Sequence, residues 1–458
     1  MDIAVIGGGI AGLSAAIALR RSGHKVTVYE KSRFSSEVGA AISVPPNAVR
    51  ELLRWGFDMD RAKATPKSQL RILDGTSLSL IREENYRDCS ELFGAPWYSL
   101  HRVDMHSELR RLAIEEKGEG TPVELFLERD ILDMDCELGT ITSKTEAPVR
   151  KDLIVLANGV HCSLQHHVTQ TPVITKDTNL VTYRALVPME DIMQHDNLRS
   201  LFQDQDPGFL NFFLPAKQQI VITFPARNGT LLHVGCMRIA DPSSCSRHVK
   251  DWNQDASKNE LLELVEGFHP TVVELAKLCD EVKCYSNVAR EPLETIHRGR
   301  VVIIGDAAHP MSPKLVQGAA QAIEEAAALG AIFAPGSRSE EVMARLNLYP
   351  KARRARGQIA ALFSNHWWTM PREQFLQKLR CFDPEFPDLP TPLIYGVALP
   401  VRRLFHSYDA RAEATKVLAD AGFHGCKDLY GMFLMQLKAI MSWMSRIFAT
   451  CFGKPKKA

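Results

Sequence analysis

A glycine-rich turn near the N-terminus constrains the fold of this chain more than any other segment. The apolar run Ile3–Ile6 leads directly into the turn, and an apolar helical pattern follows it. In such a strand–turn–helix unit, Gly7 makes the tight turn, Gly9 lets the backbone approach a pyrophosphate, and Gly12 lets the helix pack against the strand. The pattern predicts an α/β protein that begins with a Rossmann-like nucleotide-binding unit.

The residue that ends the second predicted strand indicates which nucleotide this unit prefers. Lys25–Tyr29 has the composition of a strand, and Glu30 follows it directly. A carboxylate at this place accepts hydrogen bonds from an adenosine ribose and disfavours a 2′-phosphate. The unit is therefore predicted to bind FAD or NAD in preference to NADP.

A second segment, far along the chain, indicates the same kind of site. The apolar strand Val301–Ile304 runs into Gly305 and Asp306, and an alanine-rich helix begins at Gly318. Carboxyl ends of parallel strands and helix N-termini are where α/β sheets bind cofactors. An ordinary strand–loop–helix connection is the alternative, but the N-terminal motif already indicates a cofactor site.

Two shorter segments leave their roles open. The small residues within 37–43 would let the backbone lie against a flat ligand, although close packing explains them equally well. Arg102 opens an amphipathic helix, where it could clamp a phosphate or a ribityl oxygen, or cap an exposed helix. Further strands are predicted by their composition at Gln69–Asp74, Ser77–Ile81, Glu124–Asp135, Thr140–Lys144 and Asp152–Leu156.

The chain between residues 180 and 240 has a different pattern. Alternating residues predict strands at Leu180–Pro188, Ile220–Phe224 and Leu231–Met237, the last two joined by an Asn-Gly turn. Such hairpins indicate an antiparallel sheet and a second domain. We therefore predict a cofactor domain in three parts (1–75, 101–160 and 291–336), an inserted antiparallel domain (76–100 and 161–290) and a helical C-terminal region (337–458).

Composition argues against several other classes of protein. Lysine and arginine total 55 against 54 aspartates and glutamates, a balance that does not favour a nucleic-acid binder. The 10 cysteines include no CxxC pair, so neither a disulfide framework nor a metal site is indicated. The N-terminus carries no leader pattern, and we expect a cytoplasmic protein with reduced thiols.

The last apolar segment, Lys427–Phe452, leaves three placements open. Gln436, Lys438 and Arg446 interrupt it too strongly for a membrane span. It could lie on a membrane surface as a peripheral contact, with its basic residues against anionic lipid. The two alternatives, which we favour, are burial against its own domain and burial at a homodimer contact.

Together these motifs resemble one protein family. The glycine turn with Glu30, the segment LHRVDMHSEL around Arg102, the strand that ends at Asn158, and the GDAAHPMSP and QGAAQAIEEA segments are similar to the salicylate-hydroxylase-like branch of the FAD-dependent monooxygenases. The segment TYRALVP, which contains Arg184, is also similar. The resemblance covers roughly residues 1–365, and the combined motifs are far more specific than any one of them.

The resemblance implies an FAD-binding domain, an antiparallel substrate domain and no separate nicotinamide domain. It places Arg184 in the substrate cavity as the catalytic residue, and Pro313 at the reactive face of the flavin. A helix N-terminus would stabilise the negative charge of reduced flavin. The implied cofactor contacts are Gly7, Gly9 and Gly12 to the pyrophosphate, Glu30 to the ribose, Ala41 and Arg102 to the flavin chain, Asp306 to the ribityl hydroxyls, and Gly318 and Ala319 to the isoalloxazine.

The activity implied by the resemblance is a monooxygenation. NAD(P)H reduces FAD, O2 adds to give a flavin C4a-hydroperoxide, and its distal oxygen hydroxylates or epoxidises a small aromatic, polycyclic or secondary-metabolite substrate. Arg184 would hold a phenolate or a carboxylate of that substrate. The alternatives are an oxidase or dearomatising hydroxylase on the same scaffold, and a non-catalytic flavin-binding module.

Five positions depart from the usual pattern of the family. Asn158 replaces an aspartate, Lys314 stands where an aromatic residue is frequent, and Phe224 stands where some relatives carry a catalytic tyrosine. In the flavin loop, Val316 and Ala320 replace glycine and asparagine. We expect Lys314, Val316 and Ala320 to lie where flavin and substrate meet.

Overall fold

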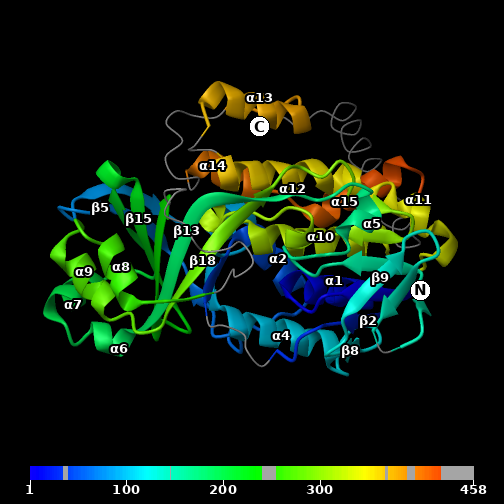
Figure 1. Cartoon of the computed structure of the whole chain (residues 1–458), viewed down its shortest axis with the longest axis horizontal. Coiled ribbons are helices and arrows are strands. Elements are labelled where there is room, and N and C mark those ends of the chain that lie inside the picture. Colours follow the sequence, from blue (N-terminus) through cyan, green and yellow to red (C-terminus); the bar gives the residue numbers. More distant parts are fainter. Residues whose placement is uncertain (35–39, 145, 240–253, 367–369, 389–397, 424–458) are drawn as a thin grey trace, which may run out of the picture.

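Two large sheets form the framework of the protein (Figure 1). The computed structural model describes residues 1–34, 40–144, 146–239, 254–366, 370–388 and 398–423. A six-stranded sheet with its helices forms one half, and an eight-stranded sheet forms the other. Strand β13 (Thr175–Pro188) begins beside the first half, and strand β18 (Val282–Arg290) ends there. At this point Arg290 donates to the carbonyl oxygen of Ala307 at 2.7 Å.

The six-stranded sheet has the order β19–β20–β12–β1–β2–β8, and only β19 runs antiparallel to its neighbour. The apolar runs of β12 and β20 are completely buried, as is typical of parallel strands covered by other elements. The Rossmann-like prediction is confirmed. The strands are β1 (Asp2–Ile6), β2 (Lys25–Tyr29), β8 (Glu124–Phe126), β12 (Leu153–Leu156), β19 (His297–Arg298) and β20 (Val301–Ile303).

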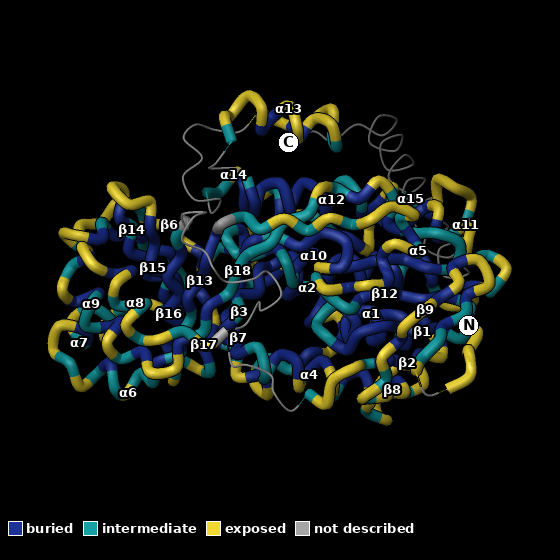
Figure 2. Tube along the Cα trace, in the orientation of Figure 1, coloured by how far each residue is buried: buried dark blue, intermediate teal, exposed yellow. Residues whose placement is uncertain are grey.

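Helix α10 (Gly318–Ile332) lies at the centre of the first half. It packs against α1 (Ile10–Arg21), α2 (Pro46–Arg54), α12 (Tyr349–His366) and α15 (Ala410–Asp420). Because nearly half of its residues are alanine, neighbouring helices can approach it closely from several sides. Nearly every residue of α10 is buried as a result (Figure 2).

The eight-stranded sheet has the order β17–β18–β13–β16–β15–β14–β5–β6. It is antiparallel as predicted, except that β14 and β5 pair in parallel. The predicted hairpin between β15 and β16 is present, with Arg227, Asn228 and Gly229 in left-handed conformations. The other strands are β5 (Gln69–Asp74), β6 (Leu80–Asn85), β14 (Gly208–Leu214), β15 (Gln219–Ala226), β16 (Leu231–Ile239) and β17 (Gln254–Ala256).

The two faces of this sheet have different environments. On β13, Val181, Tyr183 and Ala185 pack with the apolar residues of helices on the outer face. Their neighbours Thr182 and Arg184 point the other way, toward the first half of the molecule, because side chains alternate along a strand. The outer helices, at the left of Figure 1, are α6 (Met189–Ile192), α7 (Asp196–Phe202), α8 (Lys258–Leu264) and α9 (Pro270–Lys277).

Smaller elements complete the framework. Sheet β3–β7–β4 joins the two halves, sheet β11–β10–β9 adds Met134 and Ile141 to the first core, and α4 packs against α1. The bounds are β3 (Ala41–Val44), β4 (Thr65–Pro66), β7 (Tyr98–His101), β9 (Ile131–Asp135), β10 (Thr140–Ser143), β11 (Val149–Arg150), α3 (Cys89–Phe93), α4 (Arg102–Ile114), α5 (Gln165–Thr169), α11 (Val342–Leu346), α13 (Arg372–Phe382) and α14 (Leu399–His406).

The predicted strand at residues 124–135 is wrong in one respect, because it is two strands in different sheets. Glu128 adopts a left-handed backbone with φ 58°, and the chain leaves the six-stranded sheet there. The strand predicted at 77–81 begins later, at Leu80, because the Asp74 carboxylate accepts from the amides of Thr76 and Ser77 and holds a turn. Strand β5 belongs to the eight-stranded sheet, although its residues fall within the predicted segment 1–75.

The apolar segment Lys427–Phe452 lies outside the described residues, and so do its predicted contacts with a membrane or a second copy. Within the described ranges, no helix is both long enough and apolar enough to cross a bilayer.

A buried ionic network joins α10 to α12. Glu324 accepts hydrogen bonds from Arg353 at 2.8 Å, from Arg356 at 3.0 Å and from Asn47 at 2.6 Å. Burial opposes ionisation of Glu324, but the charges of Arg356 and Arg353 outweigh it and lower the pKa of the carboxyl group. Since the side chains of Arg353 and Glu324 are 0% and 1% exposed, water cannot replace either partner.

We predict that Glu324→Gln destabilises the protein by about 3–5 kcal/mol, because it leaves two buried guanidinium groups without an anion. The measurement is denaturant unfolding followed by fluorescence. Glu128→Gln is the matched control, since the Arg33–Glu128 pair is exposed and such pairs contribute less than about 1 kcal/mol. Equal destabilisation by the two substitutions would contradict the prediction.

Candidate functional site

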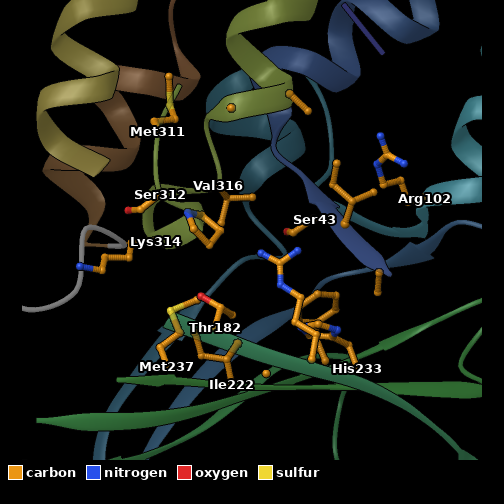
Figure 3. A pocket seen from close by; sticks show the side chains of 18 of the residues that line it. Ser43, Arg102, Thr182, Ile222, His233, Met237, Met311, Ser312, Lys314 and Val316 are labelled. Atoms are coloured by element: carbon orange, nitrogen blue, oxygen red, sulfur yellow. The ribbon is translucent and has the colours of Figure 1, made fainter. Parts of the chain in front are cut away.

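A continuous cavity of about 420 Å³ lies between the two sheets. Figure 3 shows Thr182, Ile222, His233 and Met237 on the strands at one side, and the loop with Met311, Ser312, Lys314 and Val316 at the other. The cavity also reaches Gly9 at the start of α1 and Gly318 at the start of α10. It therefore connects the predicted cofactor residues with the predicted substrate domain.

The glycines of the N-terminal turn have three distinct physical roles. Gly7 has φ +106°, and a Cβ atom there would stand 2.6 Å from the carbonyl oxygen of Ala157 on the neighbouring strand end. A Cβ at Gly12 would collide with the carbonyl oxygen of Gly7. A Cβ at Gly9 would meet no protein atom within 4 Å, because this residue faces the open cavity. Gly7 and Gly12 thus shape the turn, while Gly9 keeps space for a ligand.

Glu30 lies beside the turn but does not line the cavity. Its carboxylate accepts from the backbone amide of Gly8 at 2.6 Å and from that of Ser32 at 2.8 Å. These bonds fix the carboxylate at the carboxyl end of β2, which is the place where a ribose would be recognised.

Asp306 is held at the cavity by a carboxylate on α10. Glu325 accepts from the amide of Gly305 at 2.7 Å and pairs with His309 at 2.6 Å, so it binds the chain on both sides of Asp306. Burial alone would lower the pKa of His309, but the charge and hydrogen bond of Glu325 outweigh it and raise that pKa. The Asp306 side chain opens into the cavity, where desolvation raises the pKa of its carboxyl group and nearby cations, including Arg102, oppose the shift.

The loop before α10 contains a strained residue. Val316 has φ 58°, a conformation that β-branched residues rarely adopt and that costs on the order of 1–3 kcal/mol. Its side chain lines the cavity and packs with the aromatic cluster of the second half. The geometry explains why glycine suits this position, and why valine changes the cavity wall.

Of two further residues that were expected where flavin and substrate meet, Lys314 lines the cavity and Ala320 does not. Lys314 lines the cavity, and burial lowers the pKa of its amino group to about 7. Ala320 does not lie where flavin and substrate would meet, because it belongs to the core on which α10 packs. That expectation is corrected. Gly318, Ala319 and Ala322 lie on the face of α10 that lines the cavity, whereas the rotation of the helix turns Ala320 into the core.

Ala41 and Arg102 reach the cavity from neighbouring elements. Ala41 opens β3, and its partner across the sheet, His101, precedes α4. The amide of Arg102 donates to the carbonyl oxygen of Ala40 at 2.8 Å, which fixes the first residue of α4 beside β3. Figure 3 shows Arg102 on the opposite side of the cavity from Lys314.

The register of the eight-stranded sheet brings side chains from several strands onto the cavity floor. Arg184 lies opposite Gly235, which lies opposite Ile222. In the next row, His233 lies opposite Phe224. The guanidinium group of Arg184 stands 4.8 Å from the ring centroid of Tyr285, and burial lowers the pKa of Arg184. An arginine remains charged under these conditions, so the floor presents a cation to the cavity.

Most of the predicted site residues lie around this one cavity, and the remainder shape it from outside. Gly7, Gly12, Glu30 and Asn158 do not line it, although Ala157 and Gly159 on either side of Asn158 do. Within the described part of the chain, no group of His, Cys, Asp and Glu could hold a metal ion. The predicted residues that line the cavity are Gly9, Ala41, Arg102, Arg184, Asp306, Pro313, Gly318 and Ala319.

Three polar residues at or behind the cavity floor are not predicted by the sequence motifs. His233 and Asn211 line the cavity, and Lys67 lies behind two of its aromatic rings. His233 alternates with Gly235 and Met237 along β16, which was the one available signal that it shares their face. The sequence could not show that this face is the one toward Arg184.

Comparison with known proteins identifies the family. The profile described as "FAD binding domain" matches residues 1–364. The FAD-dependent monooxygenase phomE' of Diaporthe leptostromiformis is 31% identical over 338 residues, which cover 73% of this chain and 84% of that protein. The chain belongs to the FAD-dependent monooxygenases.

Other members of this monooxygenase family match an equal or larger share of the chain. Hispidin-3-hydroxylase of Neonothopanus nambi is 28% identical over 427 residues, covering 91% of this chain and 96% of its own. The 3-hydroxybenzoate 6-hydroxylase of Klebsiella oxytoca is 27% identical and covers 73% of this chain and 80% of its own.

Solved structures of the same fold confirm the architecture of this monooxygenase. A salicylate hydroxylase substrate complex matches with a TM-score of 0.71 at 23% identity, covering 91% of this chain and 98% of that one. CtdE in complex with FAD and a substrate matches with a TM-score of 0.73 at 19% identity, covering 92% and 98%. The predicted aromatic-hydroxylase-like fold is therefore confirmed.

The residues of this monooxygenase fit FAD. Gly9 leaves open space at the N-terminus of α1, and Gly318 places a second helix N-terminus at the same cavity. Helix N-termini favour the negative charges of a pyrophosphate and of a reduced flavin. Asp306 adds a hydrogen-bond acceptor inside the cavity, as ribityl hydroxyl groups require.

We predict that Gly9→Ala and Gly12→Ala separate cofactor binding from folding. A methyl group at Gly9 enters the cavity without touching any residue that the structure describes, so the apoprotein should unfold at the wild-type temperature but retain little FAD. A methyl group at Gly12 meets backbone, so the apoprotein itself should lose stability. Thermal unfolding of the apoproteins and FAD titration by fluorescence quenching provide the measurements. Full FAD retention by Gly9→Ala would show that the cofactor phosphates lie elsewhere.

Proposed function

We propose that this monooxygenase uses NAD(P)H and O2 to hydroxylate or epoxidise a small aromatic substrate that carries an acidic group. The observation that carries the proposal is the continuity of the cavity from Gly9 and Asp306 to the floor with Arg184. A cofactor and a substrate bound in one cavity can react directly, without transfer between sites.

The cofactor end of the cavity receives FAD through residues of the six-stranded sheet and its helices. Gly9 and the N-terminus of α1 face the pyrophosphate, with Gly7 and Gly12 setting the turn. Glu30 takes the adenosine ribose. The remaining contacts are Ala41 and Arg102 to the flavin chain, Asp306 to the ribityl hydroxyls, and Gly318 and Ala319 to the pyrimidine edge of the ring.

FAD bound at this place supplies the redox chemistry, taking electrons from NAD(P)H and activating O2. The protein then has to exclude water from the reacting atoms and to orient the substrate. Ile222, Phe224 and Met237 on the floor, with Val316 above them, provide an apolar lining suited to both tasks.

The substrate end of the cavity matches a flat aromatic compound with a negative or ionisable substituent. Phe209 and Phe224 lie there with ring centroids 5.3 Å apart, and Arg184 adds a buried positive charge. The names of the relatives point in the same direction, since they include hydroxylases of hispidin and of hydroxybenzoates.

The proposal is tested with the FAD-loaded enzyme, NADH or NADPH, ¹⁸O2 and a panel of phenols, hydroxybenzoates and hydroxypyrones. We expect one or more members to accelerate NAD(P)H oxidation and to yield a product that contains one labelled oxygen atom by mass spectrometry. Nicotinamide consumption that yields only hydrogen peroxide with every member would overturn the proposal. Substrate oxidation without nicotinamide would favour an oxidase instead.

We predict that Arg184→Ala lowers kcat/KM for an acidic substrate by about 10- to 100-fold, because a hydrogen bond to a charged group contributes about 1.5–3 kcal/mol. FAD content, measured from the flavin absorbance, should stay at the wild-type level. Lys176→Ala is the control, since Lys176 lies on the same strand with an exposed side chain paired to Glu291. Loss of flavin from Arg184→Ala would place this arginine in the cofactor site.

A further inference from the structure

The absence of a side chain at Gly235 leaves a slot in the cavity floor. Arg184 borders the slot on one neighbouring strand and Ile222 borders it on the other. A Cβ atom at Gly235 would stand 3.0 Å from Nε2 of His233, which is the nearest protein atom to that position. The glycine therefore exposes one edge of the His233 ring to the cavity.

The imidazole of His233 is fixed in place without a hydrogen bond. Its ring lies over Phe224 with the centroids 4.5 Å apart and an interplanar angle of 33°. Nδ1 is buried and has no hydrogen-bond partner among the described residues. The side chain is only 6% exposed, and its remaining exposure is toward the cavity. Stacking holds the ring, and its Nε2 edge lies beside Gly235 at the cavity.

Two more polar groups near this ring lack partners within the described part of the chain. Oδ1 of Asn211, which also lines the cavity, is buried without a hydrogen bond. Nζ of Lys67 has no hydrogen bond either, and lies 3.6 Å from the ring centroid of Phe209 and 3.8 Å from that of Phe224. Buried polar groups are nearly always hydrogen-bonded, so the unpaired groups around the His233 ring set this part of the cavity wall apart from an ordinary protein interior.

We propose that His233 is a catalytic residue that accepts the proton of a phenolic or enolic ring hydroxyl of the substrate. This inference rests on the proposed function and deepens it. The O–H bond of the substrate breaks, an N–H bond forms at Nε2, and the electron pair stays on the substrate oxygen. Arg184, on the strand beside Gly235, stabilises the resulting anion.

The electrostatic surroundings keep the imidazole of His233 uncharged, so that one ring nitrogen can accept a proton. Burial lowers the pKa of His233 well below its usual value, and the positive charges of Arg184 and Lys67 lower it further. The imidazole is therefore neutral at neutral pH, with a lone pair on one ring nitrogen. Arg184 on β13 and Lys67 before β5 are the charged groups that act on the ring, while its neighbour Phe224 on β15 is apolar.

Deprotonation of the substrate also serves the reaction. An oxygen anion on the ring donates electron density to the carbon atoms beside it, and those carbons accept an electrophilic oxygen more readily. Proton transfer by a positioned side chain contributes about 100- to 10,000-fold to the rate of such a step. A low pKa makes His233 a weak base, so Arg184 must supply part of the stabilisation by holding the anion.

The first test observes the proton without turnover. The oxidised, FAD-loaded enzyme is titrated with nitrophenol, whose phenol and phenolate forms absorb at different wavelengths. We expect wild type to bind the phenolate at a pH where nitrophenol is protonated in solution, and His233→Phe to bind the neutral phenol. Phenylalanine keeps the stacking on Phe224 but removes both nitrogen atoms, so a purely structural histidine would leave the spectrum unchanged and overturn the proposal.

The second test uses turnover of the phenol that performs best in the ¹⁸O2 screen. His233→Phe should retain FAD and lose at least 100-fold in kcat/KM at neutral pH. Its activity should recover as the pH rises toward the pKa of the free hydroxyl, about 10 for a simple phenol, because solvent then removes the proton. Wild-type kcat/KM with an unchanged pH profile would overturn the assignment of His233.

A second variant keeps the test decisive if His233→Phe fails to bind FAD. Gly235→Ala leaves the ring in place but puts a methyl group 3.0 Å from Nε2 and 3.7 Å from the carbonyl oxygen of Ile222. We expect it to bind FAD and lose turnover of phenols, and normal turnover would overturn the proposal. If wild type oxygenates no member of the panel, the proposed function itself fails; if wild type does so and both variants match it, only the role of His233 fails.

Discussion

Two adjacent buried carboxylates on α10, Glu324 and Glu325, hold the parts of the cofactor end together. Glu324 binds Arg353 and Arg356 on α12, and Glu325 binds the amide of Gly305 and the ring of His309. Neighbouring residues on a helix point in different directions, so one helix fixes a helix on one side and the Asp306 turn on another. The position of Asp306 and the place where α10 begins are thus set by one rigid element.

More basic than acidic side chains line the cavity between the two sheets. Arg102, Arg184 and Lys314 line it, whereas Asp306 is an acidic residue on its wall. Burial makes an unbalanced charge costly unless a ligand supplies the opposite charge. A dinucleotide with a pyrophosphate and a substrate that can become an anion would both provide negative charge.

Two positions that depart from the usual pattern of the family lie on the cavity wall. Val316 keeps a left-handed backbone that suits glycine, and its side chain packs toward the aromatic cluster with Phe224. Phe224 carries no hydroxyl group, and His233 on the adjacent strand stacks against it at the floor. The cavity therefore combines an apolar wall with one ionisable ring, an arrangement that selects substrates by shape and by the acidity of their hydroxyl groups.

Local patterns in the chain are sufficient to predict the FAD-binding unit, because each of its parts depends on residues that are close together in the sequence. The turn with Gly7 and Gly12, the carboxylate Glu30 after β2, and the start of α10 at Gly318 are local patterns that need no knowledge of distant contacts. Contacts between distant segments establish which face of β16 meets the cavity, that Gly235 lies beside Arg184, and that Lys67 reaches two aromatic rings from outside the sheet. Alternation along a strand gives two faces but does not choose between them, and a shift of one residue in register would have turned His233 into the opposite core.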